Sequence, residues 1–270
     1  MKNVSYRKMF DLTGKTAVVT GGTGILGRCF CAGLAEFGAN VVIIDIDESI
    51  VAGFAKDLAS KYGVTTLGIK CDTSSPKEVL DAVKLIIDKM GLIHILHNNA
   101  QGKAAPVVFE ECSLEDWRMS SSVNEEGYFL MAQAIGKQMI KQDIGGSIIQ
   151  TSSIYGIMGP DHRIYKNSSL NGNVMGSPAV YSFTKSGVIG LTKYLATYWA
   201  DNNIRVNSLT PGGVKSEQNQ AFIKQYSNRV PMGRMALREE IVGALVYLAS
   251  DASSYVTGQN IIVDGGLEAW

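Results

Sequence analysis

From position 16 to position 27 the chain reads Thr-Ala-Val-Val-Thr-Gly-Gly-Thr-Gly-Ile-Leu-Gly, an apolar run followed by a glycine-rich turn. Apolar residues then recur with helical period over Ile25–Phe37. A strand, a glycine turn and a helix in this order predict a pyrophosphate site, because glycine lets the backbone approach the anion at a helix N-terminus. The turn residues expected to bind a dinucleotide are Gly21, Thr23, Gly24, Ile25, Leu26 and Gly27.

Asp45 supports the same interpretation. It ends the next apolar run, about 20 residues after Gly24, where an acid binds the hydroxyls of the adenosine ribose. The same carboxylate would repel a 2′-phosphate, so NAD is expected rather than NADP, with Ile46 beside it in the cofactor site. Arg28, behind the last glycine, could meet a 2′-phosphate, although a role on the solvated surface is favoured.

Short apolar runs alternate with longer segments of helical period. The predicted strands are Thr16–Thr20, Val41–Asp45, Thr65–Lys70, Ile93–His97, Ser147–Thr151, Ile204–Leu209 and Asn260–Val263. The predicted helices are Ile25–Phe37, Glu48–Lys61, Pro76–Met90, Leu114–Gln142, Val180–Ala200 and Arg238–Leu248. This order predicts an α/β fold over residues 1–270: a single-domain Rossmann-type, doubly wound parallel sheet of about seven strands with helices on both faces. Residues 157–178, rich in Gly, Asn and Ser, predict an extended loop insertion.

The composition excludes several classes of protein. The 270 residues include 25 Lys and Arg and 25 Asp and Glu, so no field of one sign is available to hold nucleic acid or an anionic membrane. No apolar run is long enough to span a bilayer, and residues 1–12 lack the apolar core of a signal peptide. The histidines form no ligand pattern, so no metal is expected. Buried, reduced thiols in a cytoplasmic protein are expected for Cys29, Cys31, Cys71 and Cys112.

Tyr181 and Lys185 form a candidate catalytic pair. They stand four apart in a predicted helix, so their side chains share one face. Ser152 and Ser153 end the fifth predicted strand, at the sheet edge where α/β proteins bind ligands. A phenol can move a proton near neutral pH only if its anion is stabilised, and a nearby ammonium does this. The pattern therefore favours proton transfer coupled to hydride transfer at an alcohol carbon.

With these motifs the chain resembles the single-domain branch of the short-chain dehydrogenase/reductase family, from about Leu12 to the C-terminus. The motifs that carry the resemblance are Thr20–Gly27, Cys71-Asp72-Thr73, Asn98-Asn99-Ala100, Asn124, Ser153, Tyr181-x-x-x-Lys185, Pro211-Gly212 and Gln259–Gly266. The resemblance implies that Tyr181 is the general acid/base and that Ser153 positions the substrate oxygen. It also implies that Lys185 lowers the pKa of the tyrosine and holds the nicotinamide ribose, while Asn124 anchors a relay water.

The resemblance adds further cofactor contacts. Asp72 would meet the adenine, Asn99 and Ala100 would line the cofactor, and the backbone of Val214 would bond the carboxamide. The remaining cofactor candidates are Thr73, Gln101, Pro211 and Ser216, together with Tyr181 and Lys185.

The chain departs from the family pattern at three places. Its glycines follow the Gly-x-x-Gly-x-x-Gly spacing of the larger, sugar-nucleotide branch. Gln101 replaces the glycine that usually follows Asn-Asn-Ala, which adds a side chain near the nicotinamide. The separation of Ser153 from Tyr181 is longer than usual, so the extra residues must form a loop beside the active site, and Ser152 stays an alternative to Ser153.

The expected function is an NAD(H)-dependent oxidoreductase that interconverts a secondary alcohol and a ketone. Polar and basic residues in the 157–178 loop and after the Asn-Asn-Ala motif favour a sugar-acid, polyol or sugar-derived substrate. Alternatively, the loop is solvated and its charges face water. The candidate substrate residues are Gln101, Lys103, Arg163 and Lys166. Members that the chain resembles include sugar-acid dehydrogenases of the gluconate type and enzymes of bacterial surface-sugar synthesis.

Two other functions are open. The glycine spacing suggests a sugar-nucleotide epimerase or dehydratase, but only Asp264–Trp270 follow the last predicted strand. A catalytically idle NAD-binding regulator would need none of the four candidate catalytic residues. The resemblance also implies a homo-oligomer, a tetramer or a dimer, that pairs through Leu114–Gln142, Val180–Ala200 and Gln259–Trp270.

Overall fold

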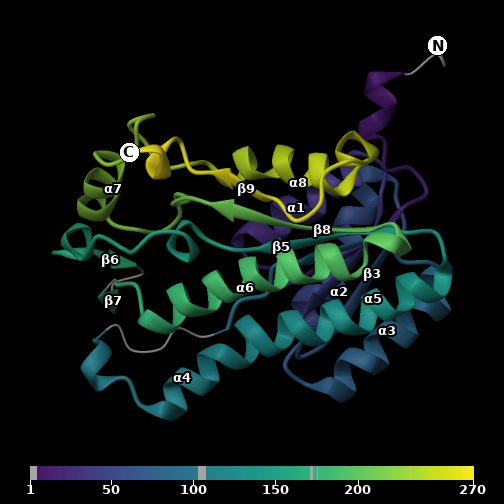
Figure 1. The fold of residues 1–270 in the computed structure, drawn as a ribbon, viewed down its shortest axis with the longest axis horizontal. Helices are drawn as coiled ribbons and strands as arrows, with labels where there is room; N and C mark the ends of the chain where they lie inside the picture. The colour runs from purple at the N-terminus through teal and green to yellow at the C-terminus, as the bar shows by residue number, and fades with distance from the viewer. Residues whose placement is uncertain (1–4, 103–107, 171–172, 175) are drawn as a thin grey trace.

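Seven parallel strands form the central sheet of the structure, a computed structural model that describes residues 5–102, 108–170, 173–174 and 176–270 (Figure 1). The strands are β1 Thr16–Thr20, β2 Asn40–Asp45, β3 Thr66–Lys70, β4 Ile95–Asn98, β5 Gly146–Thr151, β8 Ile204–Pro211 and β9 Asn260–Val263. Their order is β3-β2-β1-β4-β5-β8-β9. The chain reverses its direction of winding between β1 and β4, and in such sheets ligands bind at the carboxyl ends of the strands beside this switch point.

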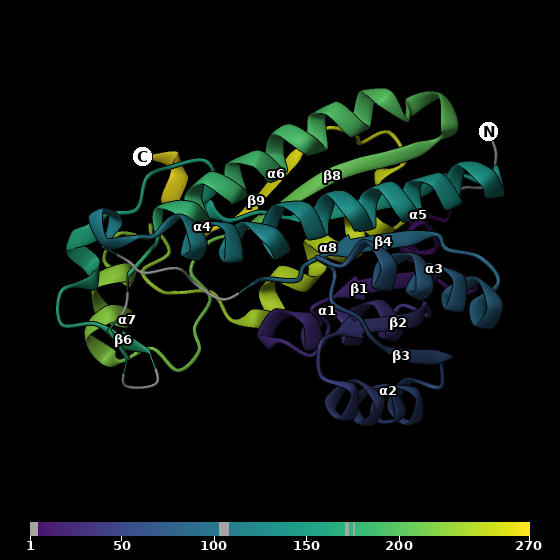
Figure 2. The ribbon, with the colours of Figure 1, turned by 90° about the horizontal axis from the view of Figure 1, so that it is seen from below.

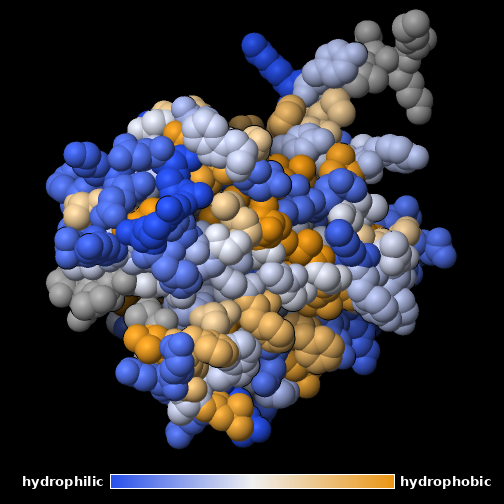
Figure 3. Space-filling model, turned by 60° about the vertical axis from the view of Figure 1, so that its left-hand side comes forward, coloured by the Kyte–Doolittle hydropathy of each residue, from blue (hydrophilic) through white to orange (hydrophobic). Residues whose placement is uncertain are grey.

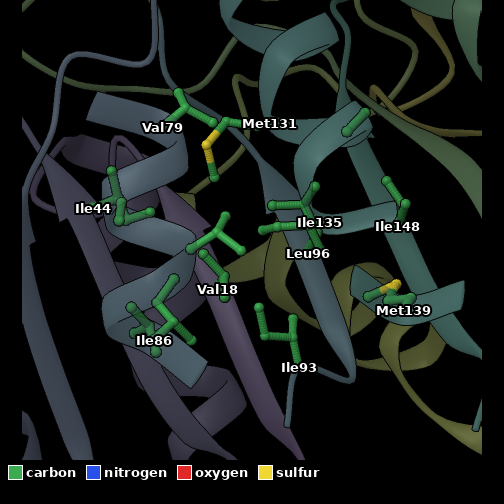
Figure 4. Packing of buried hydrophobic residues seen from close by; sticks show 14 of the residues in the cluster. Val18, Ile44, Val79, Ile86, Ile93, Leu96, Met131, Ile135, Met139 and Ile148 are labelled. Atoms are coloured by element: carbon green, nitrogen blue, oxygen red, sulfur yellow. The ribbon is translucent and has the colours of Figure 1, made fainter. Parts of the chain in front are cut away.

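Helices cover both faces of the sheet (Figure 1, Figure 2). On one face lie α1 Ile25–Glu36, α2 Glu48–Tyr62 and α8 Val242–Ala249, and on the other α3 Pro76–Met90, α5 Tyr128–Gln142 and α6 Ala179–Tyr198. Successive strand residues point to opposite faces: Val18 packs beneath α3 and α5 (Figure 4), whereas Ala17 and Val19 pack beneath α1. Every position of β1 is therefore buried, which explains why its sequence is a continuous run without polar alternation.

The helix predicted over Leu114–Gln142 is interrupted. It consists of α4 Leu114–Ser121, a π-helical turn Ser122–Gly127, and α5. The π-turn fits one additional residue into a helix that otherwise keeps its apolar period, so periodicity alone does not reveal it. Gly127 lets this turn pack closely, because a Cβ at this position would lie 2.8 Å from Thr73 Oγ1.

The insertion at 157–178 has more structure than the predicted loop. It contains a 3₁₀-helix, His162–Tyr165, and two short antiparallel strands, β6 Ser169–Leu170 and β7 Asn173–Val174. It packs on α7, Gln220–Ser227, a helix that the sequence reading missed. We call the described residues of 157–178 together with α7 the cap.

A third apolar cluster, separate from the two clusters on the faces of the sheet, packs the cap against neighbouring segments of the chain. Its buried members are Ile154, Ile164, Phe222, Tyr226, Val230, Met235 and Leu267. Asp161 forms an ion pair with Arg229, and Gln225 Nε2 donates to the carbonyl of Lys166 at 3.0 Å. The insertion and α7 are therefore one packed unit.

All four cysteines are free thiols. Cys31 and Cys71 are buried, but Cys29 and Cys112 are partly exposed, so the expectation of four buried thiols is wrong for these two. Within the described residues no helix is both long and apolar enough to cross a membrane, and no His, Cys, Asp or Glu cluster could hold a metal ion. The cytoplasmic location stays a prediction.

Candidate active site

A cavity of about 640 Å³ opens at the carboxyl ends of the strands. The glycine turn and Asp45 line one end, and Tyr181, Lys185 and the cap line the other. The lining includes these residues predicted for the site: Gly21, Thr23, Gly24, Ile25, Leu26, Gly27, Asp45, Asn99, Gln101, Asn124, Ser153, Tyr181, Lys185, Pro211, Val214 and Ser216.

The glycine turn brings backbone groups to the cavity wall. Gly21 has a positive φ of 61°, and a Cβ there would lie 2.7 Å from Ala100 Cα. A Cβ at Gly27 would overlap the carbonyl oxygen of Gly21. Gly24 caps α1 without a side-chain hydrogen bond, so the first N–H groups of the helix are left to a ligand. This backbone cradle fits the pyrophosphate of a dinucleotide cofactor.

Asp45 is fixed at the same end of the cavity. Its Oδ2 accepts hydrogen bonds from Thr23 N at 2.9 Å and Thr23 Oγ1 at 2.6 Å, and its Oδ1 accepts one from Ile46 N at 2.9 Å. Arg28 lies outside the lining: Nε donates to the carbonyl of Thr23 at 2.9 Å, and the guanidinium stacks over the ring of Phe54, 4.6 Å from its centroid. The turn therefore presents a carboxylate, and the Arg28 side chain already has partners of its own.

Lys185 lies buried beneath Tyr181 on the same face of α6. Its Nζ donates to the carbonyl of Thr151 at 2.9 Å and to Tyr128 Oη at 3.2 Å, and lies 5.9 Å from the centroid of the Tyr181 ring. Burial lowers the pKa of Lys185 to about 7. Burial also raises the pKa of Tyr181, while a hydrogen bond with the Ser153 hydroxyl opposes that rise. The structure therefore shows no lowering of the Tyr181 pKa, whereas the resemblance implies one.

The two adjacent serines have different surroundings. Ser152 Oγ donates to the carbonyl of Lys185 at 2.8 Å and so joins β5 to α6. Ser153 follows the end of β5, and its hydroxyl bonds with Tyr181 in the cavity. Of the two candidates, Ser153 is the one that can reach a substrate oxygen held by Tyr181.

Two asparagines in the cavity wall form side-chain hydrogen bonds to the backbone of neighbouring segments. Asn124, buried in the π-turn, accepts a hydrogen bond from Gly102 N at 3.0 Å through Oδ1. Asn99 Nδ2 donates to the carbonyls of Thr20 at 3.1 Å and Gly21 at 3.2 Å. Asn99 thus joins the segment after β4 to the glycine turn across the switch point.

Some predicted cofactor residues lie outside the lining: Ile46, Asp72, Thr73 and Ala100. Asp72 Oδ1 accepts hydrogen bonds from Ser74 N at 2.9 Å and Ser74 Oγ at 2.7 Å, so it shapes the loop after β3. Thr73 is buried against Gly127, and Ala100 lies against Gly21.

The structure does not place Arg163 or Lys166 in the cavity, contrary to the prediction. Arg163 Nε and Nη2 bind the two carboxylate oxygens of Asp161 at 2.8 and 2.9 Å, and its side chain is 88% exposed. Lys166 is exposed on the cap surface. An acid two positions earlier in the chain draws Arg163 away from the cavity. Lys103 lies outside the described residues.

Aromatic residues that the sequence reading missed occupy the cap end of the cavity. They are Tyr155, Tyr165, Phe222 and Tyr226. Tyr165 Oη donates to Tyr155 Oη at 2.9 Å, and Tyr226 Oη accepts from Gly213 N at 2.5 Å. The signal available in the sequence was the two tyrosines inside the segment between Ser153 and Tyr181.

A doubly wound sheet with a phosphate-binding turn at one end of its cavity and a Ser, Tyr and Lys site at the other defines a dinucleotide-dependent oxidoreductase. The family model described as enoyl-(acyl carrier protein) reductase matches residues 23–268. The chain belongs to the short-chain dehydrogenase/reductase family.

Relatives match over almost the whole chain. The 3-oxoacyl-[acyl-carrier-protein] reductase of Aquifex aeolicus is 35% identical over 260 residues, 95% of this chain and 98% of that protein. The D-threitol dehydrogenase of Mycolicibacterium smegmatis is 31% identical over 262 residues, 95% of this chain and 94% of that protein.

Solved structures agree in fold. A gluconate 5-dehydrogenase from Burkholderia cenocepacia, in complex with NADP and tartrate, has a TM-score of 0.85 and 31% identity over 97% of this chain and 98% of that one. A short-chain dehydrogenase from Leptospira borgpetersenii with bound NAD+ has a TM-score of 0.85 and 30% identity over 99% and 98%. The chain therefore shares its fold with one protein that holds NADP and with another that holds NAD+.

The different surroundings of the two serines lead to a prediction. Ser153→Ala should lower kcat by about 10²- to 10³-fold, because it removes the hydroxyl that we expect to bind the reacting oxygen. Ser152→Ala should cost about 1 kcal/mol of unfolding free energy, through loss of the bond to Lys185, and change kcat only a few-fold. Urea unfolding and steady-state kinetics on both variants measure this. A large loss of kcat confined to Ser152→Ala would reverse the assignment.

Proposed function

We propose that the protein is an NAD(H)-dependent oxidoreductase that interconverts a secondary alcohol and a ketone on a neutral polyol or sugar-derived substrate. The observation that carries the proposal is the convergence of Ser153, Tyr181 and Lys185 at one end of a cavity whose other end holds the glycine turn and Asp45. Relatives that cover nearly the whole chain are reductases and dehydrogenases, which favours this function over a sugar-nucleotide epimerase or dehydratase.

In the proposed mechanism the residues of this chain move and hold the proton. The nicotinamide cofactor supplies the acceptor or donor of the hydride. Tyr181 takes the proton from the substrate hydroxyl during oxidation and returns it during reduction. Ser153 donates a hydrogen bond to the same oxygen, and the ammonium of Lys185 stabilises the phenolate of Tyr181. Asn124, which lines the same cavity, would hold a relay water.

The lining of the cavity supports a neutral substrate. Among the lining residues that the structure describes, Lys185 is the only cation, and it is engaged beneath Tyr181. The cap contributes tyrosine hydroxyls, which suit substrate hydroxyl groups, and flat aromatic rings, which suit the faces of a sugar or a cyclic alcohol. Of the three basic residues that favoured an anionic group, Arg163 and Lys166 lie outside this lining, and Lys103 lies outside the described residues.

A substrate screen tests the proposal. Neutral polyols and sugars, sugar acids and sugar phosphates are each supplied with NAD, and nicotinamide absorbance is followed. Turnover of a neutral class is expected, and Tyr181→Phe should lower kcat by about 10²- to 10⁴-fold with NAD affinity largely kept, because it removes the transferable proton. Exclusive use of sugar acids would contradict the neutral substrate. Tight NAD binding without any turnover would favour the regulator, and full activity in Tyr181→Phe would contradict the mechanism.

Cofactor choice gives a separate prediction. The Asp45 carboxylate, fixed by Thr23 and Ile46, would lie against a 2′-phosphate, so kcat/KM should be higher with NAD than with NADP. Asp45→Ala should narrow that ratio about tenfold or more, because one charge repulsion of about 1.4 kcal/mol corresponds to a factor of ten. Asp47→Ala is the control, since Asp47 caps α2 outside the cavity. A higher kcat/KM with NADP in the unmodified protein would refute NAD preference.

We also propose a homo-oligomer, with a tetramer favoured over a dimer. Large apolar side chains are exposed on α4 and α5 (Leu114, Met119, Phe129 and Ile140), on α6 (Phe183, Tyr194 and Tyr198) and near the C-terminus (Ile262 and Trp270). Figure 3 shows one face of the molecule, on which apolar residues gather in patches between polar areas. Burying such patches in a closed symmetric assembly would be favourable.

Light scattering measures the assembly directly. A mass near four times 29.1 kDa is expected at micromolar concentration. A mass of 29.1 kDa under these conditions would contradict the proposed oligomer.

A further inference from the structure

The hydroxyl of Tyr128 lies buried beside the candidate catalytic lysine. Tyr128 is the first residue of α5, and 2% of its surface is exposed. Its Oη accepts a hydrogen bond from Lys185 Nζ at 3.2 Å and donates one to the carbonyl of Thr151 at 3.0 Å. Lys185 Nζ also lies 5.0 Å from the centroid of the Tyr128 ring. Tyr128 therefore contacts the ammonium through both its hydroxyl and its ring.

The surroundings of Lys185 show why this contact matters. The titratable side chains facing it are Tyr128 from α5, Tyr181 from its own helix and His97 from β4. Burial lowers the pKa of His97 to about 3, so His97 is neutral. No carboxylate is recorded in contact with Lys185 among the described residues. The hydrogen-bond partners of the Lys185 amine are therefore neutral groups, the Tyr128 hydroxyl and the Thr151 carbonyl.

We propose that Tyr128 is a positioning residue that holds the amino group of Lys185 in place and keeps it protonated through its hydroxyl. The lone pair of Oη and the carbonyl of Thr151 both face the amine and favour its charged form. Burial raises the pKa of Tyr128 itself, so its hydroxyl stays neutral and acts as a fixed dipole. The proposal rests on the function proposed above, because it gives the ammonium the task of stabilising the Tyr181 phenolate.

The π-turn explains how Tyr128 reaches this position. Asn124 lies within the turn and Tyr128 directly follows it, so both side chains are presented to the sheet edge from one segment. Thr151 ends β5, and Lys185 comes from α6. The three elements meet at the Thr151 carbonyl, which accepts from both Lys185 and Tyr128.

The titration of Lys185 in the protein without substrate tests the proposal directly. Lysine labelled with carbon-13 at Cε reports protonation by NMR, with the Lys185 signal assigned by its loss in Lys185→Arg. Tyr128→Phe keeps the ring and removes only the hydroxyl, so the titration midpoint of Lys185 should move to lower pH, by about one unit. Thr192→Val is the control: it removes a buried hydroxyl that donates to Val188 on the same helix, away from the cavity. In Thr192→Val the titration midpoint of Lys185 should equal that in the unmodified protein.

The pH dependence of alcohol oxidation gives the second measurement. Lys185 loses its proton at lower pH in Tyr128→Phe, so near neutral pH a smaller fraction of the protein holds an ammonium beside Tyr181. There kcat/KM should fall by up to about tenfold, because one pKa unit changes the charged fraction by at most a factor of ten. Thr192→Val should leave kcat/KM unchanged.

An unchanged Lys185 midpoint in Tyr128→Phe overturns the proposal, whatever happens to thermal stability. If the Phe variant does not fold, Tyr128→Met, which also lacks the hydroxyl, takes its place with the same expectation. The NMR titration needs no turnover, so it decides the role of Tyr128 even if no substrate is found and the proposed function fails.

Discussion

The carbonyl oxygen of Thr151 is the point on which the candidate active site depends. It accepts hydrogen bonds from Lys185 Nζ at 2.9 Å and from Tyr128 Oη at 3.0 Å. A buried amine is costly unless it has hydrogen-bond partners, and a strand end offers an acceptor whose position the sheet fixes. Because β5, α5 and α6 all meet at this atom, Tyr181, one helical turn before Lys185, is placed where the cavity opens.

The two ends of the cavity are built by different forces. At the cofactor end, the backbone comes so close that no side chain fits at Gly21, which lies against Ala100, or at Gly27, which lies against Gly21. The apolar cluster on this face of the sheet holds the arrangement. At the substrate end, the cap packs with neighbouring segments in a separate apolar cluster, and Asp161 forms ion pairs with Arg163 and Arg229. Substitutions in the cap can therefore change the substrate end without disturbing the packing of the sheet.

Local patterns explain which predictions were correct. The strands were predicted within a few residues, because strands covered on both faces form continuous apolar runs. The π-turn and the short strands of the insertion were missed because one extra residue or two-residue strands leave no periodic signal. α7 was missed although Asn219 caps it and its buried residues Phe222 and Tyr226 stand four apart. Charge and position in the loop suggested Arg163 as a substrate ligand, but composition does not give direction, and Asp161 holds its guanidinium at the surface.

The sequence by itself determined the chain order of the seven sheet strands and of the helices between them, the glycine turn with Asp45, and the pairing of Tyr181 with Lys185. These features depend on neighbours along one element or at one strand-to-helix junction, where spacing alone sets the geometry. Only the tertiary structure decided that Tyr128 reaches Lys185, 57 positions away, and that Arg229 reaches Asp161, 68 positions away. Periodicity tells which face of a helix is buried, but the partner on that face is set by how distant elements pack, which no local spacing contains.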